Sequence, residues 1–438
     1  MITYSFLIIL TFIILNFYLN KNKNFIFYFL FSLIMFIFID LSNFQIFLWT
    51  LCSFIFINIL NNIDLKLDIL LLYNFLIFSV YTIFLFENLI ILYLCIEIQT
   101  FSLFILICSE KKNIKSLEAG LKYFILGSIS SSIFLLGTVI LFKIFPLLEV
   151  NLFNFLIKDF NNFYFLGNIM ILSSLIFKIG LSPFHYWIAD IYEGSNLNLV
   201  SLLASIPKLS LFYIVLKFNA IYEIIFICSI LSILIGTIAG FNQTKFKRLI
   251  AYSGITNFGF IFLGLSLNNL LGLEVSLFYL FIYLLSNFFF LLILTIYNYK
   301  FNYVIELSNY YYYNKILSIV LIVFILSIAG IPPLIGFLNK LFIVETLIFY
   351  NLFLTALFCI IITSIGIGFY LRLIKILIFQ DYSNFISWSN IIKFEYHDFK
   401  YCNIINSVFI FYFLTFYFIN PRLFIIIIDF LLNCYRWI

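Results

Sequence analysis

Charged residues are scarce in this sequence. Only 10% of its 438 residues are Asp, Glu, Lys or Arg, whereas 65% are hydrophobic and the mean hydropathy is +1.18. Soluble domains carry about 25% charged residues, so the composition excludes a soluble globular protein. It predicts an all-α polytopic membrane protein, because an apolar helix satisfies its own backbone hydrogen bonds in lipid.

Sequence patterns for redox chemistry are also missing. No G-x-G-x-x-G precedes a helix, there is no Walker A motif, and the seven cysteines are scattered without a C-x-x-C pair. The two histidines, His185 and His397, lie too far apart to form a paired haem site on one helix. We therefore expect no metal site, no disulfide framework and no redox cofactor on this chain.

Long apolar runs dominate instead. A membrane-spanning helix needs about 17–25 apolar residues, and runs of this kind lie near 3–20, 25–41, 44–61, 69–86, 88–109, 117–142, 163–184, 197–216, 221–241, 249–268, 272–298, 316–347, 350–371 and 404–421. They predict about fourteen transmembrane helices. The first run begins without the basic leader or cleavage site of a signal peptide, so we expect a retained helix there.

The charges between these runs are unevenly distributed. If the runs cross the membrane alternately, most lysines and arginines fall on one face, among them Lys115, Lys245 and Arg248. Lys143 and Lys217 belong to the smaller group on the opposite face. Because positive residues are enriched in cytoplasmic loops, we expect the larger group on the cytoplasm-equivalent face.

Several ionisable residues lie inside the apolar runs, where charge is costly. They are Glu97, Glu118, Lys122, Lys178, Lys208 and Lys340. A charged side chain within the bilayer costs at least about 2.5–3.5 kcal/mol on insertion scales, and such residues often form proton relays. Lysine suits a relay because burial or a nearby carboxylate changes its proton affinity, whereas arginine stays protonated. We therefore predict a buried proton relay from this set.

Each member of the set also has a plainer interpretation. A single buried lysine can snorkel or pack without moving protons, although four such lysines together favour a relay. Glu118 and Lys122, spaced i and i+4 on one helical face, could form an interfacial ion pair. Glu97 has no opposite charge within a helical turn, so its partner must lie elsewhere in the chain.

Two of the apolar runs contain helix-breaking residues close to a lysine. Gly180 and Pro183 follow Lys178, and a G-I-P-P sequence that begins at Gly330 precedes Lys340. Proline removes a backbone donor and interrupts a helix. Freed backbone groups at membrane depth are tolerated only inside protein or beside a cavity, so both breaks should lie next to functional groups.

Broken helices at corresponding places of a chain are a sign of inverted repeats. We expect two inverted five-helix repeats, at 67–216 and 217–371. N-terminal transmembrane helices at 1–66 should precede them, and a polar connection with a C-terminal helix should follow at 372–438. The sequence similarity between the two predicted repeats is weak.

Six separated segments resemble one known family. They are IEIQTFSLFIL (96–106), SLEAGLKYFILGSISSS (116–132), FKIGLSPFHYWIADIYEGS (177–195), PKLSLF (207–212), QTKFKRLIAYSGITNFGF (243–260) and GIPPLIGFLNK (330–340). In this order they are similar to the subunit 2, or chain N, family of antiporter-like subunits of respiratory complex I. The resemblance spans 90–345, and the first three helices and the tail from 372 add little to it.

The resemblance implies a fold and a function. The family has fourteen helices, two inverted repeats with broken helices, and an axis of ionisable residues that carries protons when ubiquinone is reduced elsewhere in the complex. Matched by motif, the axis residues are Glu97 on the fifth helix, Glu118 and Lys122 on the sixth, Lys178 on the broken seventh, Lys208 on the eighth and Lys340 on the broken twelfth. Lysine at position 340 favours the subunit 2 type, because the related subunit 4 type usually has glutamate there.

The resemblance also implies a location and partners. We expect a multi-pass protein of the mitochondrial inner membrane, and the 62 Phe and 30 Tyr fit an A/T-rich organellar genome. The expected partners are other complex I membrane subunits, including neighbouring antiporter-like subunits, accessory subunits and lipids such as cardiolipin. We expect no nucleic acid among them.

Two positions depart from the family pattern. Asn257 replaces a histidine that is common in the S-x-x-H-x-G-Y motif, and E-G-S-N-L at 193–197 replaces the usual E-G-A-P. Asparagine does not titrate, so the pattern assigns no proton step to position 257.

Two other functions fit the same residues. A subunit of a stand-alone cation/proton antiporter would use the same lysines to exchange sodium for protons. A membrane scaffold would use them only to fix helix packing, paired with carboxylates.

Overall fold

The protein is helical throughout the part of the chain that the structure describes. The computed structural model describes residues 45, 48, 51, 52, 67–109, 113–144, 162–218, 221–296, 303–309 and 315–379. The helices there are α4 (Leu67–Leu85), α5 (Leu89–Ile107), α6 (Ile114–Ile144), α8 (Asn162–Ile179), α9 (Tyr186–Gly194), α10 (Leu197–Lys217), α11 (Tyr222–Phe241), α12 (Phe246–Leu265), α13 (Leu270–Ile296), η1 (Val304–Asn309), α15 (Lys315–Ala329), α16 (Ile335–Phe349) and α17 (Phe353–Phe379). The predicted all-α membrane fold is confirmed.

The predicted spans between 69 and 371 all appear as helices. Within the described residues, seven helices are long and apolar enough to cross a membrane, among them α5, α10 and α17. The run predicted at 316–347 is divided into α15 and α16, whereas the run predicted at 163–184 covers α8 and the break after it, and α9 follows as a helix that no apolar run predicted. Both predicted helix breaks are therefore confirmed, while the spans before residue 67 and the span at 404–421 lie largely or wholly outside the described residues.

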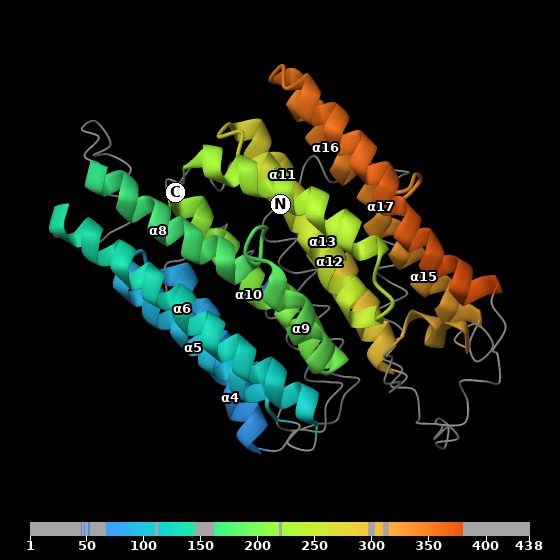
Figure 1. The fold of residues 1–438 in the computed structure, drawn as a ribbon, viewed down its shortest axis with the longest axis horizontal. Helices are drawn as coiled ribbons and strands as arrows, with labels where there is room; N and C mark the ends of the chain where they lie inside the picture. Colours follow the sequence, from blue (N-terminus) through green and yellow to red (C-terminus); the bar gives the residue numbers. More distant parts are fainter. Residues whose placement is uncertain are drawn as a thin grey trace, which may run out of the picture.

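The helices form one bundle (Figure 1). The helices at its centre are more deeply buried than those at its edges. In α10, α12 and α13, 89% of the residues in the most apolar stretch of the helix are buried inside the protein, compared with 39% in α6 and 33% in α17. The central helices pack against one another, α10 on α13 and α12 on α13. Apolar side chains such as Leu121, Val139, Leu354 and Leu357 are exposed on the outer helices, as expected for surfaces that face lipid.

The two halves of the bundle have the same order of elements. In each half the fourth crossing segment is the broken one, α8 with α9 and α15 with α16, and one unbroken helix follows it, α10 or α17. The first half lies on one side of Figure 1 and the second half on the other, and α9 packs on α12 between them. The repeat boundaries at 67–216 and 217–371 stay a prediction.

Candidate functional site

The first helix break lies directly after Lys178. Gly180 has φ +83°, a left-handed conformation that glycine adopts without steric cost, and its N–H donates to the carbonyl of Ile176 at 2.9 Å. The indole N–H of Trp187, at the start of α9, donates to the carbonyl of Phe177 at 3.0 Å. The break thus satisfies carbonyls at the end of α8 and holds Lys178 in the last turn of that helix.

Lys178 faces a carboxylate on another helix. Its Nζ lies 3.7 Å from Glu97 Oε1, and the side chains are 8% and 18% exposed. This separation exceeds hydrogen-bond length, so the pair is electrostatic. The hydroxyl of Thr100 donates to the other oxygen, Glu97 Oε2, at 3.3 Å. The partner that Glu97 lacks on its own helix is therefore Lys178, on α8.

Lys208 lies in the middle of α10, one residue after Pro207, and is only 4% exposed. Its Nζ lies 4.5 Å from the ring centroid of Phe258 and 6.0 Å from that of Tyr192. No carboxylate of the described residues forms an ion pair with it within 4.0 Å. Aromatic faces thus provide the electrostatic partners of this ammonium group, in the manner of cation–π pairs.

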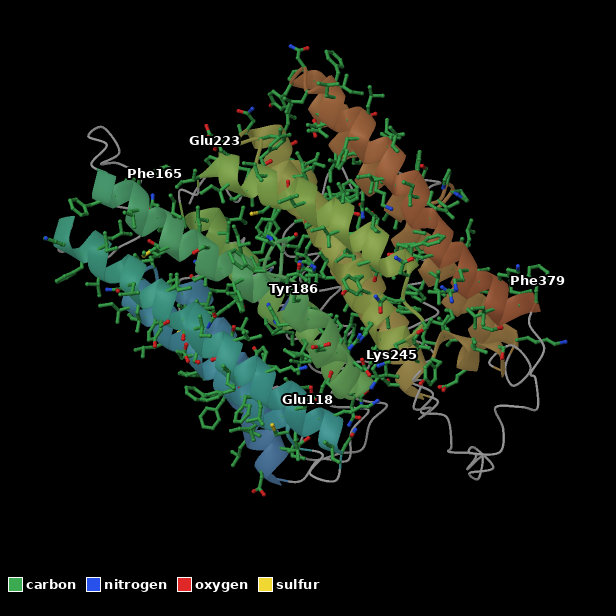
Figure 2. The ribbon with its side chains drawn as sticks, in the orientation of Figure 1. Glu118, Phe165, Tyr186, Glu223, Lys245 and Phe379 are labelled. Carbon is green, nitrogen blue, oxygen red and sulfur yellow. The ribbon has the colours of Figure 1, made fainter. Side chains whose placement is uncertain are left out.

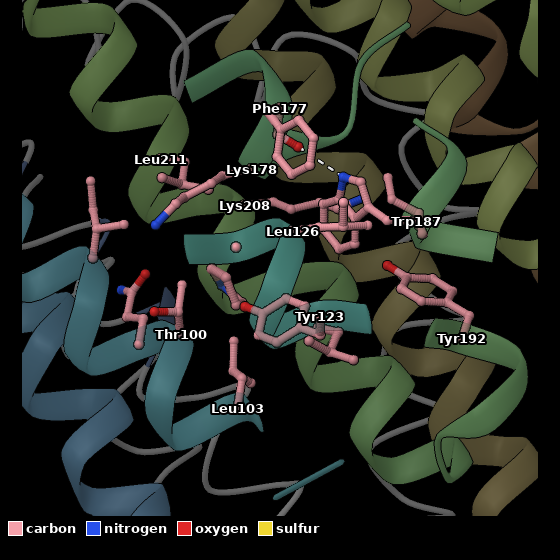
Figure 3. A pocket seen from close by; sticks show the side chains of 16 residues that line it. Thr100, Leu103, Tyr123, Leu126, Phe177, Lys178, Trp187, Tyr192, Lys208 and Leu211 are labelled. Carbon is pink, nitrogen blue, oxygen red and sulfur yellow. Dashed lines mark hydrogen bonds between the residues drawn. The ribbon is translucent and has the colours of Figure 1, made fainter. Parts of the chain in front are cut away.

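Lys178 and Lys208 line the same cavity inside the first half of the bundle (Figure 3). The space inside the cavity that water can reach amounts to about 40 Å³. Gln99 and Thr100 line it as polar residues, and Tyr123 and Leu211 are among its other walls. About 10–15 Å³ of such space is enough for one water molecule, which also needs polar partners. The cavity therefore has room for a few water molecules beside these polar groups.

Lys340 lies at the second helix break, away from this cavity. Its Nζ donates to the carbonyl of Ala329, the last residue of α15, at 2.5 Å. Gly330 has φ +77°, and a Cβ on it would come within 2.9 Å of Lys340 Cδ. The ring centroid of Phe260 is 5.9 Å from Nζ. Lys340 therefore satisfies a carbonyl that the break leaves free.

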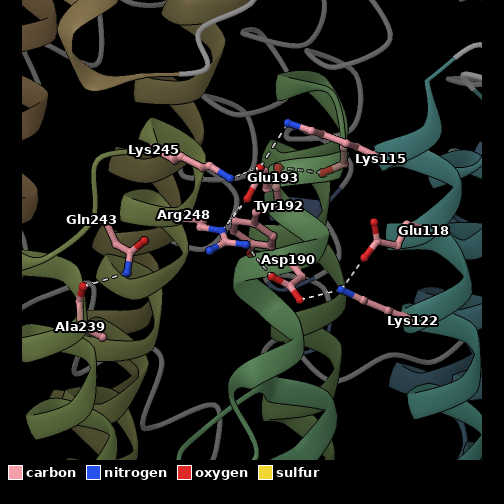
Figure 4. A network of polar contacts seen from close by, with 11 residues as sticks. Lys115, Glu118, Lys122, Asp190, Tyr192, Glu193, Ala239, Gln243, Lys245 and Arg248 are labelled. Carbon is pink, nitrogen blue, oxygen red and sulfur yellow. Dashed lines mark hydrogen bonds and ion pairs between the residues drawn. The ribbon is translucent and has the colours of Figure 1, made fainter.

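Glu118 and Lys122 belong to a separate ion network (Figure 4). Their side chains pair at 2.8 Å and are 61% and 41% exposed, and Lys122 Nζ also lies 2.9 Å from Asp190 Oδ2. Arg248 Nη2 lies 2.9 Å from Asp190 Oδ1. The pair is thus one end of a network that connects α6, α9 and α12, and it does not line the cavity of Lys178 and Lys208.

Glu193 is the second centre of this network. Its Oε1 lies 2.5 Å from Lys245 and 3.6 Å from Lys115, and its Oε2 lies 2.5 Å from Arg248 Nε. Burial raises the pKa of this carboxyl, but the hydrogen bond from Lys245 and the nearby positive charges outweigh it and lower the pKa below the usual value. Glu193 lies outside the long candidate spans, next to the end of α9.

The sequence offered only weak signals for this network. From the sequence alone, Asp190 and Glu193 could simply be solvent-exposed loop residues. Lys245 and Arg248 could be positively charged loop residues on the cytoplasm-equivalent face. Their spacing, i and i+3 in each pair, is the one feature that places each pair on a common helical face. Nothing local indicates that these two faces meet.

Asn257, at the position where the family commonly has a histidine, is 3% exposed and both donates and accepts a hydrogen bond. Its Nδ2 donates to the carbonyl of Ser253 at 2.8 Å, and its Oδ1 accepts from the hydroxyl of Tyr279 at 2.8 Å. The amide thus joins α12 to α13 as a structural link. Among the described residues no group of His, Cys, Asp or Glu is arranged to hold a metal ion.

Comparisons with known proteins agree with the fold and the motifs. The family model described as NADH:quinone oxidoreductase/Mrp antiporter, transmembrane, matches residues 87–367. NADH-ubiquinone oxidoreductase chain 2 of Metridium senile is 32% identical over 308 residues, which cover 68% of this chain and 80% of the relative. NADH-quinone oxidoreductase subunit N of Pelagibacter ubique is 31% identical over 306 residues, covering 67% of this chain and 65% of the relative.

The same fold is found in a solved structure. A chain of respiratory complex I from Thermus thermophilus superposes with a TM-score of 0.75 at 22% sequence identity, over 86% of this chain and 84% of that one. At this identity the likeness concerns the fold, whereas the family match and the relatives concern the sequence itself. The chain belongs to the family of NADH-ubiquinone oxidoreductase chain 2 and NADH-quinone oxidoreductase subunit N.

Proposed function

We propose that this chain is an antiporter-like membrane subunit of respiratory complex I that moves protons while quinone is reduced elsewhere in the complex. The observation that carries the proposal is the cavity inside the first half of the bundle, which both Lys178 and Lys208 line. Family membership supplies the reaction that drives it. This chain's own contribution is the movement of protons, with no redox cofactor bound to it.

The geometry supports distinct roles for the residues. In general, a lysine holds its proton beside a carboxylate and releases it more readily in an apolar site. Glu97 therefore tunes Lys178 across their 3.7 Å separation, and Lys208, surrounded by aromatic rings, exchanges protons with Lys178 through water in the cavity. Lys340 acts at the second break, on the exit side. Glu118 and Lys122 form an exposed ion pair at the edge of the bundle, outside this path.

The partners and the location follow from the family. We propose that the chain assembles with other complex I membrane subunits, including neighbouring antiporter-like subunits, and with accessory subunits and lipids such as cardiolipin. The mitochondrial inner membrane is the proposed location. NADH-ubiquinone oxidoreductase chain 2 of Arabidopsis thaliana matches this chain, and bacterial relatives match it as well. The exposed apolar faces of α6 and α17 provide surface for subunits and lipids.

The experiment that tests this function uses Lys208→Ala in the assembled complex, reconstituted in vesicles. We expect NADH-driven proton uptake to fall while the complex still assembles, because the mutant cavity has lost a titratable group. Lys143→Ala is the matched control, since Lys143 lies in the last turn of α6 and is exposed. Unchanged proton uptake in Lys208→Ala would favour the scaffold, in which this lysine only packs.

The family model also includes Mrp antiporters, so a stand-alone cation/proton antiporter is the second candidate. It would exchange sodium for protons without NADH. Purification of the chain together with flavin-containing and iron–sulfur-containing subunits, and proton uptake that needs NADH but no sodium, would exclude this function.

A further inference from the structure

A row of polar side chains continues along α10 beyond Lys208. Ser210, Tyr213 and Lys217 are spaced i, i+3 and i+7, which places them on one face of the helix. Most of this helix is buried: the rest of the bundle covers 89% of the residues in its most apolar stretch. Polar groups in such a position need partners, and each of the three has one from the first helices of the bundle.

The first step of this row joins the cavity. Gln99 lines the cavity that Lys178 and Lys208 share, and its Nε2 donates to the hydroxyl of Ser210 at 3.1 Å. Gln99 is 3% exposed and Ser210 is fully buried. A hydrogen bond between α5 and α10 therefore leads from the cavity into the interface of these two helices.

The second step is the hydroxyl of Tyr213, one helical turn further. It accepts from Gln45 Nε2 at 2.9 Å and donates to the carbonyl of Phe84 at 3.3 Å. Gln45 Nε2 also donates to Phe84 at 2.6 Å. Tyr213 is 2% exposed. A buried, hydrogen-bonded hydroxyl thus lies between Ser210 and the end of the helix.

The row ends in an ion pair. Lys217 Nζ binds the carboxylate of Glu87 and lies 5.1 Å from the ring centroid of Tyr213. The side chain of Lys217 is 7% exposed, whereas that of Glu87 is 30% exposed. Only the carboxylate therefore reaches the surface, and the ammonium group lies between it and the buried hydroxyl.

The ion pair lies at the end of α10 opposite the ion network. The start of α10 is close to that network, because Lys247 Nζ donates to the carbonyl of Ser195 at 2.5 Å. Glu118 and Lys245 of the network lie toward one end of the bundle, and Phe165 and Glu223 toward the other (Figure 2). The loop charges also place Lys217 on the face opposite Lys245. The row therefore extends from the cavity toward the opposite face of the membrane.

We propose that Ser210, Tyr213 and the Lys217–Glu87 pair form a proton path from the cavity to that face, separate from Lys340. The proposal rests on the proposed function, which supplies protons to the cavity. In this path water carries the proton across the gaps between the groups, and each hydroxyl gives up its own proton as it accepts another, so neither is left charged. Lys217 passes a proton to Glu87, which releases it to water, and Lys217 then takes up the proton that arrives through Tyr213.

The test uses two variants that keep the packing. Lys217→Arg keeps the charge and the ion pair, but arginine does not release its proton. Tyr213→Phe keeps the ring and removes the hydroxyl. Both are compared with Lys208→Ala and with the control Lys143→Arg, by measuring protons translocated per NADH oxidised in vesicles that contain the assembled complex.

We expect Lys217→Arg and Tyr213→Phe each to lower this ratio, by no more than Lys208→Ala does because Lys340 remains on the exit side, with Lys143→Arg at the parental value. The parental ratio in Lys217→Arg or in Tyr213→Phe, together with a lowered ratio in Lys208→Ala, overturns the path and leaves the proposed function intact. A parental ratio in Lys208→Ala overturns both. If the Lys217–Glu87 ion pair is only structural, Lys217→Arg should keep the parental ratio while Lys208→Ala lowers it, because arginine preserves the pair.

Discussion

The ammonium group of Lys178 on α8 lies 3.7 Å from the carboxylate of Glu97 on α5, and both side chains are mostly buried. The two residues are far apart in the sequence, and Lys178 lies in the last turn of α8, just before the break. Removing one member of a buried pair is more costly than the pair is worth, because the other charge is left without a partner. This relationship leads to the first prediction.

Glu97→Gln should reduce both proton movement and stability. The amide leaves Lys178 without a counter-charge, and loss of one partner from a buried pair costs about 3–5 kcal/mol. We expect a lower temperature of thermal inactivation and a lower ratio of protons to NADH. Glu223→Gln is the matched control, because Glu223 is an exposed carboxylate in the first turn of α11. Equal behaviour of the two variants would contradict a role for the pair.

Gly330→Ala should disturb the second break. An alanine at φ +77° is strained by about 1–3 kcal/mol, and its Cβ would lie 2.9 Å from Lys340 Cδ. We expect poorer assembly of the complex, measured on native gels, and slower proton uptake. Gly240→Ala is the control, since a Cβ there meets its nearest atom at 3.5 Å, an ordinary contact. Normal assembly and proton uptake in Gly330→Ala would show that Lys340 tolerates displacement.

Lys122→Gln separates the two interpretations of the Glu118–Lys122 pair. The lysine is 41% exposed and pairs with Glu118 and Asp190, and exposed ion pairs contribute about 0–1 kcal/mol each. Because Lys122 is exposed, we expect Lys122→Gln to lose only a little thermal stability, to lose less of it at high salt, and to retain proton uptake. A large loss of proton uptake at normal stability would instead place Lys122 in the relay, as the family motif implies.

Asn257→Leu should destabilise the protein more than it affects proton movement. The change removes the hydrogen bonds to Ser253 and Tyr279 and leaves the buried hydroxyl of Tyr279 without this acceptor, which costs about 1–3 kcal/mol. Thermal inactivation of the complex measures the first effect and the proton-to-NADH ratio the second. The double variant Asn257→Leu with Tyr279→Phe should recover part of the stability, because no polar group is then left unsatisfied. Absence of that recovery would argue against the link.

Much of the architecture could be predicted because it depends on local sequence. The apolar runs predicted most of the described helices, although α9 lies beyond the run at 163–184 and α17 continues to Phe379, past the predicted end at 371. Pro183 and Pro333 with their glycines predicted where two helices break. Proline and glycine act on their own backbone. The six candidate residues were identified in the same way, since charge inside an apolar run is visible without any knowledge of packing.

The contacts between these residues could not be predicted from the local sequence. The sequence determined that the protein is a helical membrane protein with lysines beside two broken helices, because hydropathy and helix breaking are properties of short segments. The tertiary structure alone decided that Lys178 meets Glu97, that Lys208 faces Phe258 with no ion pair within the described residues, and that Asp190 and Glu193 join α6 to α12. Such contacts depend on which helix faces come together across long stretches of chain, and an apolar helix surface in lipid carries little local information about its neighbours.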